Sequence, residues 1–234
     1  MHVLVTGANS GIGKEITRQL VTAGHTVWAA ARDPERGRAA AAETGARPLV
    51  LDVTDERSIA AAVERVAELD VLVNNAGIGD RGEQPADLDT DTLRRVYETN
   101  VFGVVAVTNA FLPTLRRSAR PRIVNISSGT GSLGWSTGPN PQFDHRTGGA
   151  AAAYRSSKTA LNALTVHYGQ MLAAEGFKVN ALAPGLRATN LNARAAELGG
   201  VPGEAAAAAV RLAQLAPDGP TAGFFSWDGT VAPW

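Results

Sequence analysis

The chain has 234 residues, of which 44% are hydrophobic, and its 22 basic side chains balance 22 acidic ones. This length is enough for one sizeable core, so we expect a single domain over residues 1–234. The balanced charge argues against a nucleic-acid partner, and no apolar run approaches the ~20 residues of a membrane span. The chain has no cysteine, which excludes disulfides and a thiolate nucleophile.

The four histidines are too scattered to suggest a metal cluster, so no metal is expected. The first strand begins near His2, which leaves no room for a signal peptide. We therefore expect a cytoplasmic protein that binds a small molecule. The content of Ala, Gly and Arg indicates a GC-rich genome and favours a bacterial source.

Short β-rich runs alternate with longer helical patterns along the chain. Strands are predicted at 2–6, 25–30, 46–51, 70–73, 122–127, 177–183 and 223–225, and helices at 11–23, 34–43, 55–68, 89–117, 150–174 and 203–215. This alternation is typical of βαβ units and predicts an α/β fold with a parallel sheet. Pro113 is expected to bend or shorten its helix. The stretch 129–149 is rich in Gly, Pro, Ser and Thr and is predicted to be a long loop.

Six chemically distinctive residues each lie at the carboxyl end of a predicted strand. In chain order they are Gly7, Arg32, Asp52, Asn74, Ser128 and Pro184. In an open parallel sheet, ligands bind at the carboxyl ends of the strands. These residues are therefore expected to converge on one edge of the sheet.

The first strand and the first helix are joined by a glycine-rich turn. Its candidate cofactor-binding residues are Gly7, Asn9, Ser10, Gly11, Ile12 and Gly13. Glycines permit a tight turn and the close approach of a pyrophosphate to the positive end of the helix. A glycine-rich turn alone is weak evidence, because it also serves as an ordinary connection between strand and helix.

Three ordered motifs together resemble the short-chain dehydrogenase/reductase family, and in particular its NADPH-dependent carbonyl reductases. They are Thr6-Gly7-Ala8-Asn9-Ser10-Gly11-Ile12-Gly13, Asn74-Asn75-Ala76-Gly77 and Tyr154-Arg155-Ser156-Ser157-Lys158. The resemblance extends from Val3 to about Phe225. It implies a Rossmann sheet of about seven strands in the order 3-2-1-4-5-6-7, with helices on both faces.

The end of the second strand indicates the choice of cofactor. A carboxylate there would bind a ribose 2′-hydroxyl and repel a 2′-phosphate, but the matching position is Ala31. Arg32 follows and offers a guanidinium to a phosphate, so we expect NADP(H). The alternative is that Arg32 is a surface charge and Asp33 takes the ribose.

The resemblance assigns further contacts to the cofactor. Asp52 and Val53 resemble the adenine contact, and Asn74, Ala76 and Gly77 resemble the turn beside adenine and its ribose, although Asn74 could be purely structural. After the sixth strand, Pro184 and Gly185 would turn around the nicotinamide, and Thr189 matches a position that contacts its carboxamide or the phosphates.

Tyr154 and Lys158 are four residues apart on a predicted helix, so their side chains leave the same face. A nearby ammonium favours a phenolate, so Lys158 is expected to lower the pKa of Tyr154 and suit it to proton transfer. The resemblance adds that Lys158 binds the nicotinamide ribose. It also makes Ser128 the serine that orients the substrate oxygen, with Ser127 as the alternative, and matches Asn100 to the asparagine that supports a proton relay. Asn100 could also simply distort its helix.

Two segments depart from the common family pattern. Ser128 and Tyr154 are 26 positions apart, about twice the usual separation, because of an insertion at about 132–149. A longer insertion occurs in monomeric carbonyl reductases, so a monomer is favoured and a homodimer is the alternative. Trp135, Phe143 and His145 are expected near the substrate mouth. Residues of about 186–203, with the polar Asn190, Asn192, Arg194 and Glu197, correspond to a substrate lid.

The predicted function is NADPH-dependent reduction of a ketone or aldehyde to an alcohol, with alcohol oxidation as the reverse reaction. Alternatives are reduction of an imine or activated alkene in secondary metabolism, or a catalytically idle NADP(H)-binding sensor or scaffold. Sugar-nucleotide epimerases share the tyrosine and lysine, but they have a different glycine spacing and a longer carboxyl-terminal domain.

Overall fold

The structure, a computed structural model, describes residues 1–142, 150–189, 191, 196–197 and 199–234. Its strands form one sheet in which all neighbours are parallel, in the order β3-β2-β1-β4-β5-β6-β7. The strands are β1 His2–Val5, β2 Thr26–Ala31, β3 Arg47–Val50, β4 Val71–Asn74, β5 Arg122–Ile126, β6 Lys178–Ala183 and β7 Gly223–Ser226. The predicted α/β fold and strand order are confirmed.

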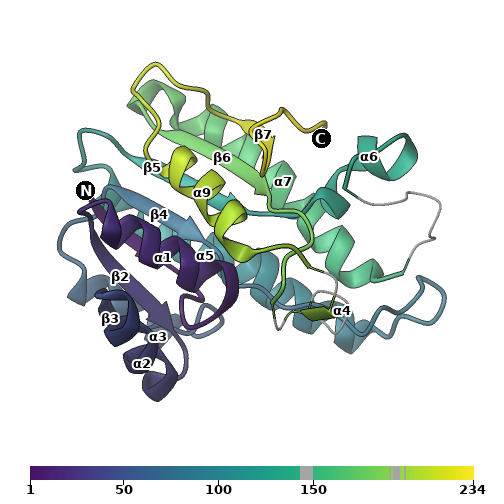
Figure 1. Ribbon diagram of the computed structural model, residues 1–234, viewed down its shortest axis with the longest axis horizontal. Coiled ribbons are helices and arrows are strands. Elements are labelled where there is room, and N and C mark those ends of the chain that lie inside the picture. Colours follow the sequence, from purple (N-terminus) through teal and green to yellow (C-terminus); the bar gives the residue numbers. More distant parts are fainter. Residues whose placement is uncertain (143–149, 190, 192–195, 198) are drawn as a thin grey trace.

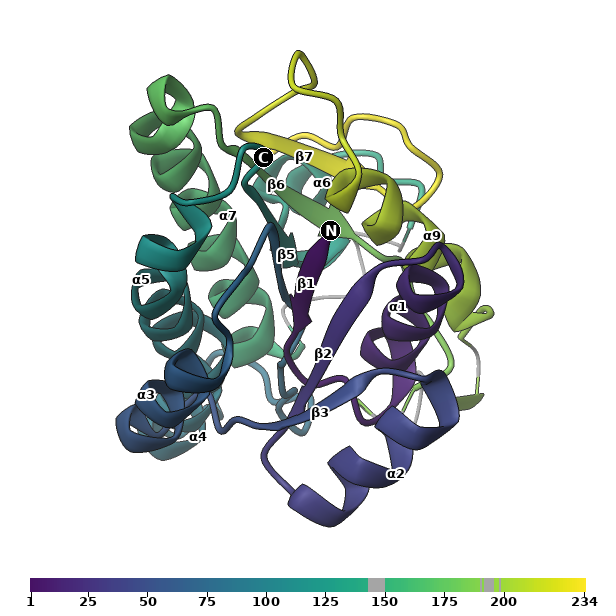
Figure 2. The same cartoon turned by 90° about the vertical axis from the view of Figure 1, so that its left-hand side faces the viewer.

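Helices cover both faces of this sheet (Figures 1 and 2). The α-helices are α1 Gly11–Thr22, α2 Pro34–Thr44, α3 Glu56–Arg65, α4 Thr90–Tyr97, α5 Gly103–Leu115, α6 Leu133–Thr137, α7 Ala152–Leu172 and α9 Pro202–Ala213. Figure 2 shows α1 and α9 on one side of the sheet and α3, α5 and α7 on the other. The result is a three-layer arrangement with the sheet in the middle.

Side chains of each strand alternate between the two faces of the sheet, so a hydrophobic core forms on each face. In β1, Val3 and Val5 join the cluster beneath α1 and α9, whereas Leu4 joins the cluster beneath α3 and α5. Successive side chains of a strand point to opposite faces, so a continuous apolar strand such as β1 is buried on both. Burial on both faces fixes the position of the strands. The polar residues that follow the strands are therefore held at one edge of the sheet.

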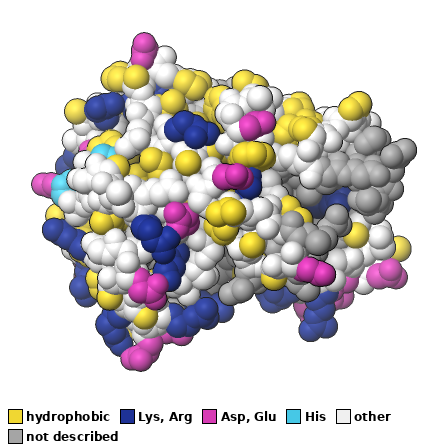
Figure 3. Space-filling model, viewed as in Figure 1, with side chains coloured by type: hydrophobic (Ala, Val, Ile, Leu, Met, Phe, Trp, Pro, Cys, Tyr) yellow, Lys and Arg dark blue, Asp and Glu magenta, His cyan; other side chains and the backbone are white. Residues whose placement is uncertain are grey.

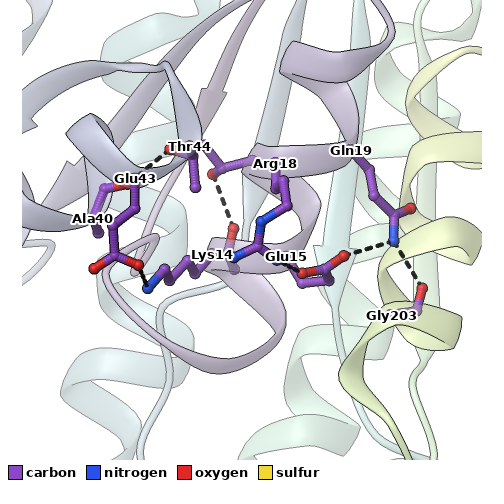
Figure 4. A network of polar contacts seen from close by, with 10 residues as sticks. Lys14, Glu15, Arg18, Gln19, Ala40, Glu43, Thr44 and Gly203 are labelled. Carbon is purple, nitrogen blue, oxygen red and sulfur yellow. Dashed lines mark hydrogen bonds and ion pairs between the residues drawn. The ribbon is translucent and has the colours of Figure 1, made fainter.

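Polar contacts add to the packing around α1 (Figure 4). Lys14 pairs with Glu43 of α2, and Gln19 donates to Glu15 and to the carbonyl oxygen of Gly203 in α9, at 3.1 and 3.0 Å. These contacts tie α1 to both of its neighbours. On the face in Figure 3, basic and acidic side chains are interspersed, and no extended surface of one charge is seen.

The predicted helix 89–117 is not one regular helix. A π-helix, η1 at Glu98–Phe102, separates α4 from α5, and Pro113 lies within α5, which ends at Leu115. The difference has a physical cause at Asn100, because its buried side chain bonds across to a neighbouring loop. Asn100 makes these bonds from within the π-helical turn.

The predicted loop at 129–149 also contains helical structure in its described part. A 3-10 helix, η2 at Gly129–Gly131, is followed by α6. Ser132 caps α6 by accepting from the amide of Trp135 at 3.0 Å, and its hydroxyl donates to the carbonyl oxygen of Pro233 at 2.6 Å. The carboxyl-terminal residues near Pro233 therefore stabilise η2 and α6. The composition of residues 129–149 did not predict this contact.

The expectation that Trp135 lies at the substrate mouth is wrong. Its side chain is buried in a small cluster with Phe224 and Ala232, on the outer part of the sheet. Phe143 and His145 lie outside the described residues, as do Asn190, Asn192 and Arg194 of the expected lid.

Candidate active site

The loops that follow the carboxyl ends of the strands enclose a cavity of about 720 Å³. It brings together candidate residues from every part of the chain. Among its lining residues are Gly7, Asn9, Ser10, Gly11, Ile12, Gly13, Arg32, Asp52, Val53, Ala76, Gly77, Ser128, Tyr154, Lys158, Pro184, Gly185 and Thr189. Asn74 and Asn100 do not line it.

The glycine-rich turn is compact because its neighbours leave no room for side chains. Gly7 has a φ of 63°, and a Cβ there would lie 2.9 Å from the Cα of Ala76. At Gly13, a Cβ would lie 2.5 Å from the carbonyl oxygen of Gly7. The N-cap Ser10 makes no capping bond, and the first turn of α1 has no acidic residue. These residues fit the pyrophosphate of a dinucleotide, since a helix N-terminus favours an anion.

Asn75 is a supporting residue that the sequence analysis missed. Its Nδ2 donates to the carbonyl oxygens of Thr6 and Gly7, at 2.9 and 3.1 Å. Its backbone amide and that of Ala76 both donate to the Thr6 hydroxyl. The turn after β4 therefore fixes the turn after β1. The sequence signal was present, because Asn75 stands in the same Asn-Asn-Ala-Gly motif.

Two arginines lie at the end of the cavity formed by β2. Arg32 was expected, but Arg36, on the first turn of α2, was not. Among the described residues, neither guanidinium has a carboxylate within ion-pair distance. Asp33 caps α2 by accepting from the amides of Glu35 and Arg36 at 2.9 and 3.2 Å. One oxygen of its carboxylate, Oδ1, is thus engaged with the helix, so Asp33 has a structural role at the start of α2.

Asn74 is committed to the sheet. It is 3% exposed, and its Nδ2 donates to Asn125 and Thr108 at 2.9 and 3.1 Å. This geometry supports the structural alternative for Asn74 over direct contact with a nucleotide. Asp52 and Val53 do line the cavity, and Asp52 holds its own turn by accepting from the amide and hydroxyl of Thr54.

Tyr154 and Lys158 share one face of α7, as their spacing predicted. The Lys158 Nζ lies 5.7 Å from the centre of the Tyr154 ring and donates to the carbonyl oxygen of Ile126 at 2.8 Å. Burial lowers the pKa of Lys158 to about 8. The ammonium is therefore held inside the protein by one carbonyl oxygen at the end of β5.

The expectation that Lys158 lowers the pKa of Tyr154 is wrong for this structure. Burial raises the pKa of Tyr154, a hydrogen bond with Ser128 opposes that effect, and the charge of Asp80 raises the pKa further. Burial dominates because it disfavours the phenolate. Near neutral pH the phenol accordingly keeps its proton.

The two neighbouring serines have different surroundings. Ser127 is 1% exposed, and its hydroxyl donates to Asn162 at 2.6 Å. Ser128 caps η2 by accepting from the amide of Thr130 at 3.2 Å, and its hydroxyl lies 2.9 Å from that of Thr130. Of the two, Ser128 is the one whose hydroxyl also interacts with Tyr154.

Asn100 lies in the π-helix, outside the cavity lining, and bonds to two segments that carry site residues. Its side chain accepts from the amide of Ile78 and donates to the carbonyl oxygen of the same residue, both at 2.9 Å. It also donates to the Ser157 hydroxyl at 3.0 Å. Asn100 therefore both occupies a distorted helix and connects the loop after β4 to α7.

The segment after β6 closes the other side of the cavity. Gly185 has a φ of 70°, and Thr189 faces the glycine turn, where a Cβ on Gly11 would lie 3.1 Å from its Cγ2. Arg187 is 6% exposed, stacks on Trp227, and pairs with Glu204 of α9 at 2.6 Å. Leu186 and Gly200 are hydrogen-bonded, so both ends of the expected lid are joined.

A Rossmann sheet with this glycine turn, two arginines, a tyrosine and a lysine around one cavity defines the class of dinucleotide-dependent oxidoreductases. A family model described as short chain dehydrogenase matches residues 1–198. The chain belongs to the short-chain dehydrogenase family. It is a pyridine-nucleotide-dependent oxidoreductase of the type that interconverts alcohols and carbonyls.

Sequence relatives agree in class and differ in substrate. A short-chain dehydrogenase of Penicillium roqueforti, anuI, is 37% identical over 201 residues, covering 80% of this chain and 79% of that protein. Galactitol 2-dehydrogenase (L-tagatose-forming) of Cereibacter sphaeroides is 34% identical, covering 98% and 94%. These relatives include fungal and bacterial proteins, so they do not establish the expected bacterial source.

Solved structures differ in the cofactor they hold. NADPH-bound carbonyl reductase from chicken fatty liver has a TM-score of 0.83 and 29% identity, covering 100% of this chain and 98% of that one. A 3-ketoacyl-(acyl-carrier-protein) reductase from Brucella melitensis, complexed with NADH, has a TM-score of 0.83 and 25% identity, covering 96% and 95%. Within the described ranges of our chain, no helix has the length and apolar character to cross a membrane.

Proposed function

We propose that the protein reduces a ketone or aldehyde to an alcohol with NADPH, and that the reaction is reversible. The observation that carries the proposal is the placing of its charged and catalytic groups in one cavity. Arg32 and Arg36 follow β2, and Ser128 follows β5, three strand spacings away, or about 14 Å. A dinucleotide that lies across the glycine turn would span this distance.

Arg32 and Arg36 support NADPH over NADH. Two guanidinium groups without a carboxylate partner among the described residues suit the 2′-phosphate of the adenosine. The capping bonds of Asp33 favour the same assignment, because they direct one oxygen of this carboxylate to the amides of α2. NADPH-bound carbonyl reductase supports it as a structural relative.

The chemistry follows from Tyr154, Ser128 and Lys158. The bound cofactor supplies hydride to the carbonyl carbon. The Ser128 hydroxyl orients the carbonyl oxygen, and the Tyr154 phenol donates its proton to that oxygen as negative charge develops. The raised pKa of Tyr154 supports this role, since it keeps the donor protonated at neutral pH. Lys158 lines the cavity next to Tyr154, and its ammonium would bind the nicotinamide ribose there.

The test compares the parent chain with Tyr154→Phe in NADPH oxidation against a panel of ketones and aldehydes. We expect kcat to fall about 10²- to 10⁴-fold in Tyr154→Phe, with NADPH binding retained, because the variant lacks only the proton donor. Tyr168→Phe is the matched control. Tyr168 lies on the same helix but outside the cavity, and its hydroxyl donates to Asn109. The kcat of Tyr168→Phe should therefore stay within about twofold of the parent value.

The same assay tests the choice of cofactor. Arg32→Ala and Arg36→Ala should each weaken NADPH binding about tenfold or more and change NADH binding little, since a charge-assisted bond contributes about 1.5–3 kcal/mol. Arg38→Ala, which removes an exposed pair with Glu35, is the control. Full activity in Tyr154→Phe would reject the proton donor. Tight NADPH binding without any turnover by the parent would favour an idle sensor.

A further inference from the structure

The helix that carries Tyr154 receives no side-chain cap from its own N-cap residue. Its N-cap is Ala151, with a φ of 63° and no side chain able to accept a hydrogen bond, and the first turn of α7 has no acidic residue. The free amides at such a helix end normally bind a side-chain acceptor. Here the acceptors come from the loop that follows β4, about 70 residues earlier in the chain.

Two contacts join that loop to α7. The carbonyl oxygen of Glu83 accepts from the amide of Ala152 at 3.3 Å, and Oδ2 of Asp80 accepts from the amide of Tyr154 at 3.1 Å. Tyr154 is the third residue of the helix, and its amide is one of those that an ordinary N-cap side chain would bind. Asp80 thus occupies the place of the missing cap.

We propose that Asp80 is a positioning residue for Tyr154: it caps α7 from the loop after β4, fixes the backbone of the tyrosine, and places a negative charge close to this residue. The proposal rests on the proposed function, in which Tyr154 is the proton donor. Asp80 does not line the cavity, so it acts through Tyr154 and not on the substrate.

The backbone of Tyr154 is held on both sides. Asp80 accepts from its amide, and the Ser157 hydroxyl donates to its carbonyl oxygen at 2.7 Å. Both contacts lead back to Asn100, which donates to Ser157 and binds both polar groups of the Ile78 backbone, two residues before Asp80. Asn100 and Asp80 therefore hold opposite ends of one short segment against α7.

The carboxylate of Asp80 is itself held in place. Its second oxygen, Oδ1, accepts from the amide of Gly82 at 3.1 Å, in a turn where Gly82 has a φ of 89°. The next turn is closed by Glu83, whose side chain accepts from the amide of Arg81 at 2.9 Å. A carboxylate with both oxygens engaged presents a fixed charge to its neighbours.

The charge of Asp80 acts in the same direction as burial and raises the pKa of Tyr154. Other charged groups around Tyr154, among the described residues, are Lys158, with its Nζ 5.7 Å from the ring centre, and Arg155, the next residue of α7, which lines the cavity. Removal of the Asp80 charge should therefore lower the pKa of Tyr154 and leave these cations in place.

Two variants separate the charge from the cap. Asp80→Asn keeps one oxygen for the amide of Tyr154, removes the charge, and gives up the oxygen that accepts from the amide of Gly82. Asp80→Ala removes both. Asp89→Asn is the matched control, because Asp89 caps α4 through the amides of Asp91 and Thr92 and lies outside the cavity.

The charge is measured by NMR titration of the tyrosine Cζ carbons, which is practical because the chain has three tyrosines. Tyr154→Phe assigns the signal. In Asp80→Asn we expect a larger ionised fraction of Tyr154 at each alkaline pH than in the parent or in Asp89→Asn. The alkaline decline of kcat for carbonyl reduction should move to lower pH in the same variant, since reduction needs the protonated phenol.

The cap is measured by kinetics. Asp80→Ala should lose kcat about tenfold or more with little change in the KM for NADPH, because a small displacement of a catalytic group is costly. An unchanged Tyr154 titration in Asp80→Asn, or full kcat in a folded Asp80→Ala, would overturn the proposal. If Asp80→Ala does not fold, the titration of Asp80→Asn decides alone. Failure of the proposed function would be seen separately, as full activity in Tyr154→Phe.

Discussion

Lys158 combines deep burial with one hydrogen bond of its ammonium among the described residues. The side chain is 4% exposed, and its Nζ donates to the carbonyl oxygen of Ile126. An ammonium in such a place is poorly solvated, which is why its pKa falls from 10.5 to about 8. The residue is therefore unfavourable for folding of the free protein, as expected of a group kept for function.

This cost should be visible as a pH dependence of stability. Between pH 8 and pH 10.5 the unfolded lysine holds a proton that the folded one has lost, so the free energy of unfolding rises with pH by about 3 kcal/mol relative to Lys158→Met. Below pH 8 both states are protonated and the difference is constant. Urea unfolding of both proteins at pH 7.5 and pH 10 measures the change, and equal differences at the two pH values would contradict it.

The residue scale also shows which assignments a sequence can make. Tyr154 and Lys158 were assigned from a motif that resembles a known family, and their spacing predicted that a helix would bring both side chains to one face. Asp33 could not be assigned in the same way, since its carboxylate suits either a ribose or the first turn of α2. Its bonds to the amides of Glu35 and Arg36 favour the helix cap.

At the scale of elements, the π-helix η1 is the clearest departure from a regular pattern. The apolar spacing of 89–117 is helical throughout, so nothing in the periodicity marks the extra residue at Glu98–Phe102. The feature depends on a partner more than 20 residues away, the backbone of Ile78. Such π-helical turns are frequent at functional sites.

Asn100→Ala should remove the reason for this distortion. It leaves the amide and carbonyl of Ile78 without their partner, so we expect the free energy of unfolding to fall by about 2–3 kcal/mol and kcat to fall with it. Asn109→Ala, on α5, removes the exposed hydrogen bond that the hydroxyl of Tyr168 on α7 donates to Asn109; it is the control and should cost below about 1 kcal/mol. Thermal and urea unfolding measure both, and similar losses in the two variants would argue against the special role of Asn100.

At the scale of the whole molecule, both edges of the sheet are protected. At β7, Val231 bridges Phe225, and the amide of Ala232 donates to Phe224 at 2.8 Å. At β3, Pro48 has no amide to offer to another strand. Covered or proline-bearing edges prevent sheets from joining through their strands.

We therefore expect a monomer in solution. Light scattering coupled to size-exclusion chromatography, over about 10–100 μM protein, should give the mass of one chain at all concentrations. A dimer would contradict this expectation and would have to form through helices. Phe102→Asp would then test the face of η1, where Phe102 is 55% exposed.

The sequence by itself determined the order of strands and helices, the glycine turn, and the pairing of Tyr154 with Lys158, because each depends on local spacing or on neighbours in the chain. The tertiary structure decided whatever depends on distant partners. Examples are the burial that raises the pKa of Tyr154, the cap that Asp80 supplies to α7, and the hydrogen bond from the N-cap residue of α6, Ser132, to the carbonyl oxygen of Pro233. The last two examples are contacts between residues 70 or more positions apart, and no local sequence pattern predicts them.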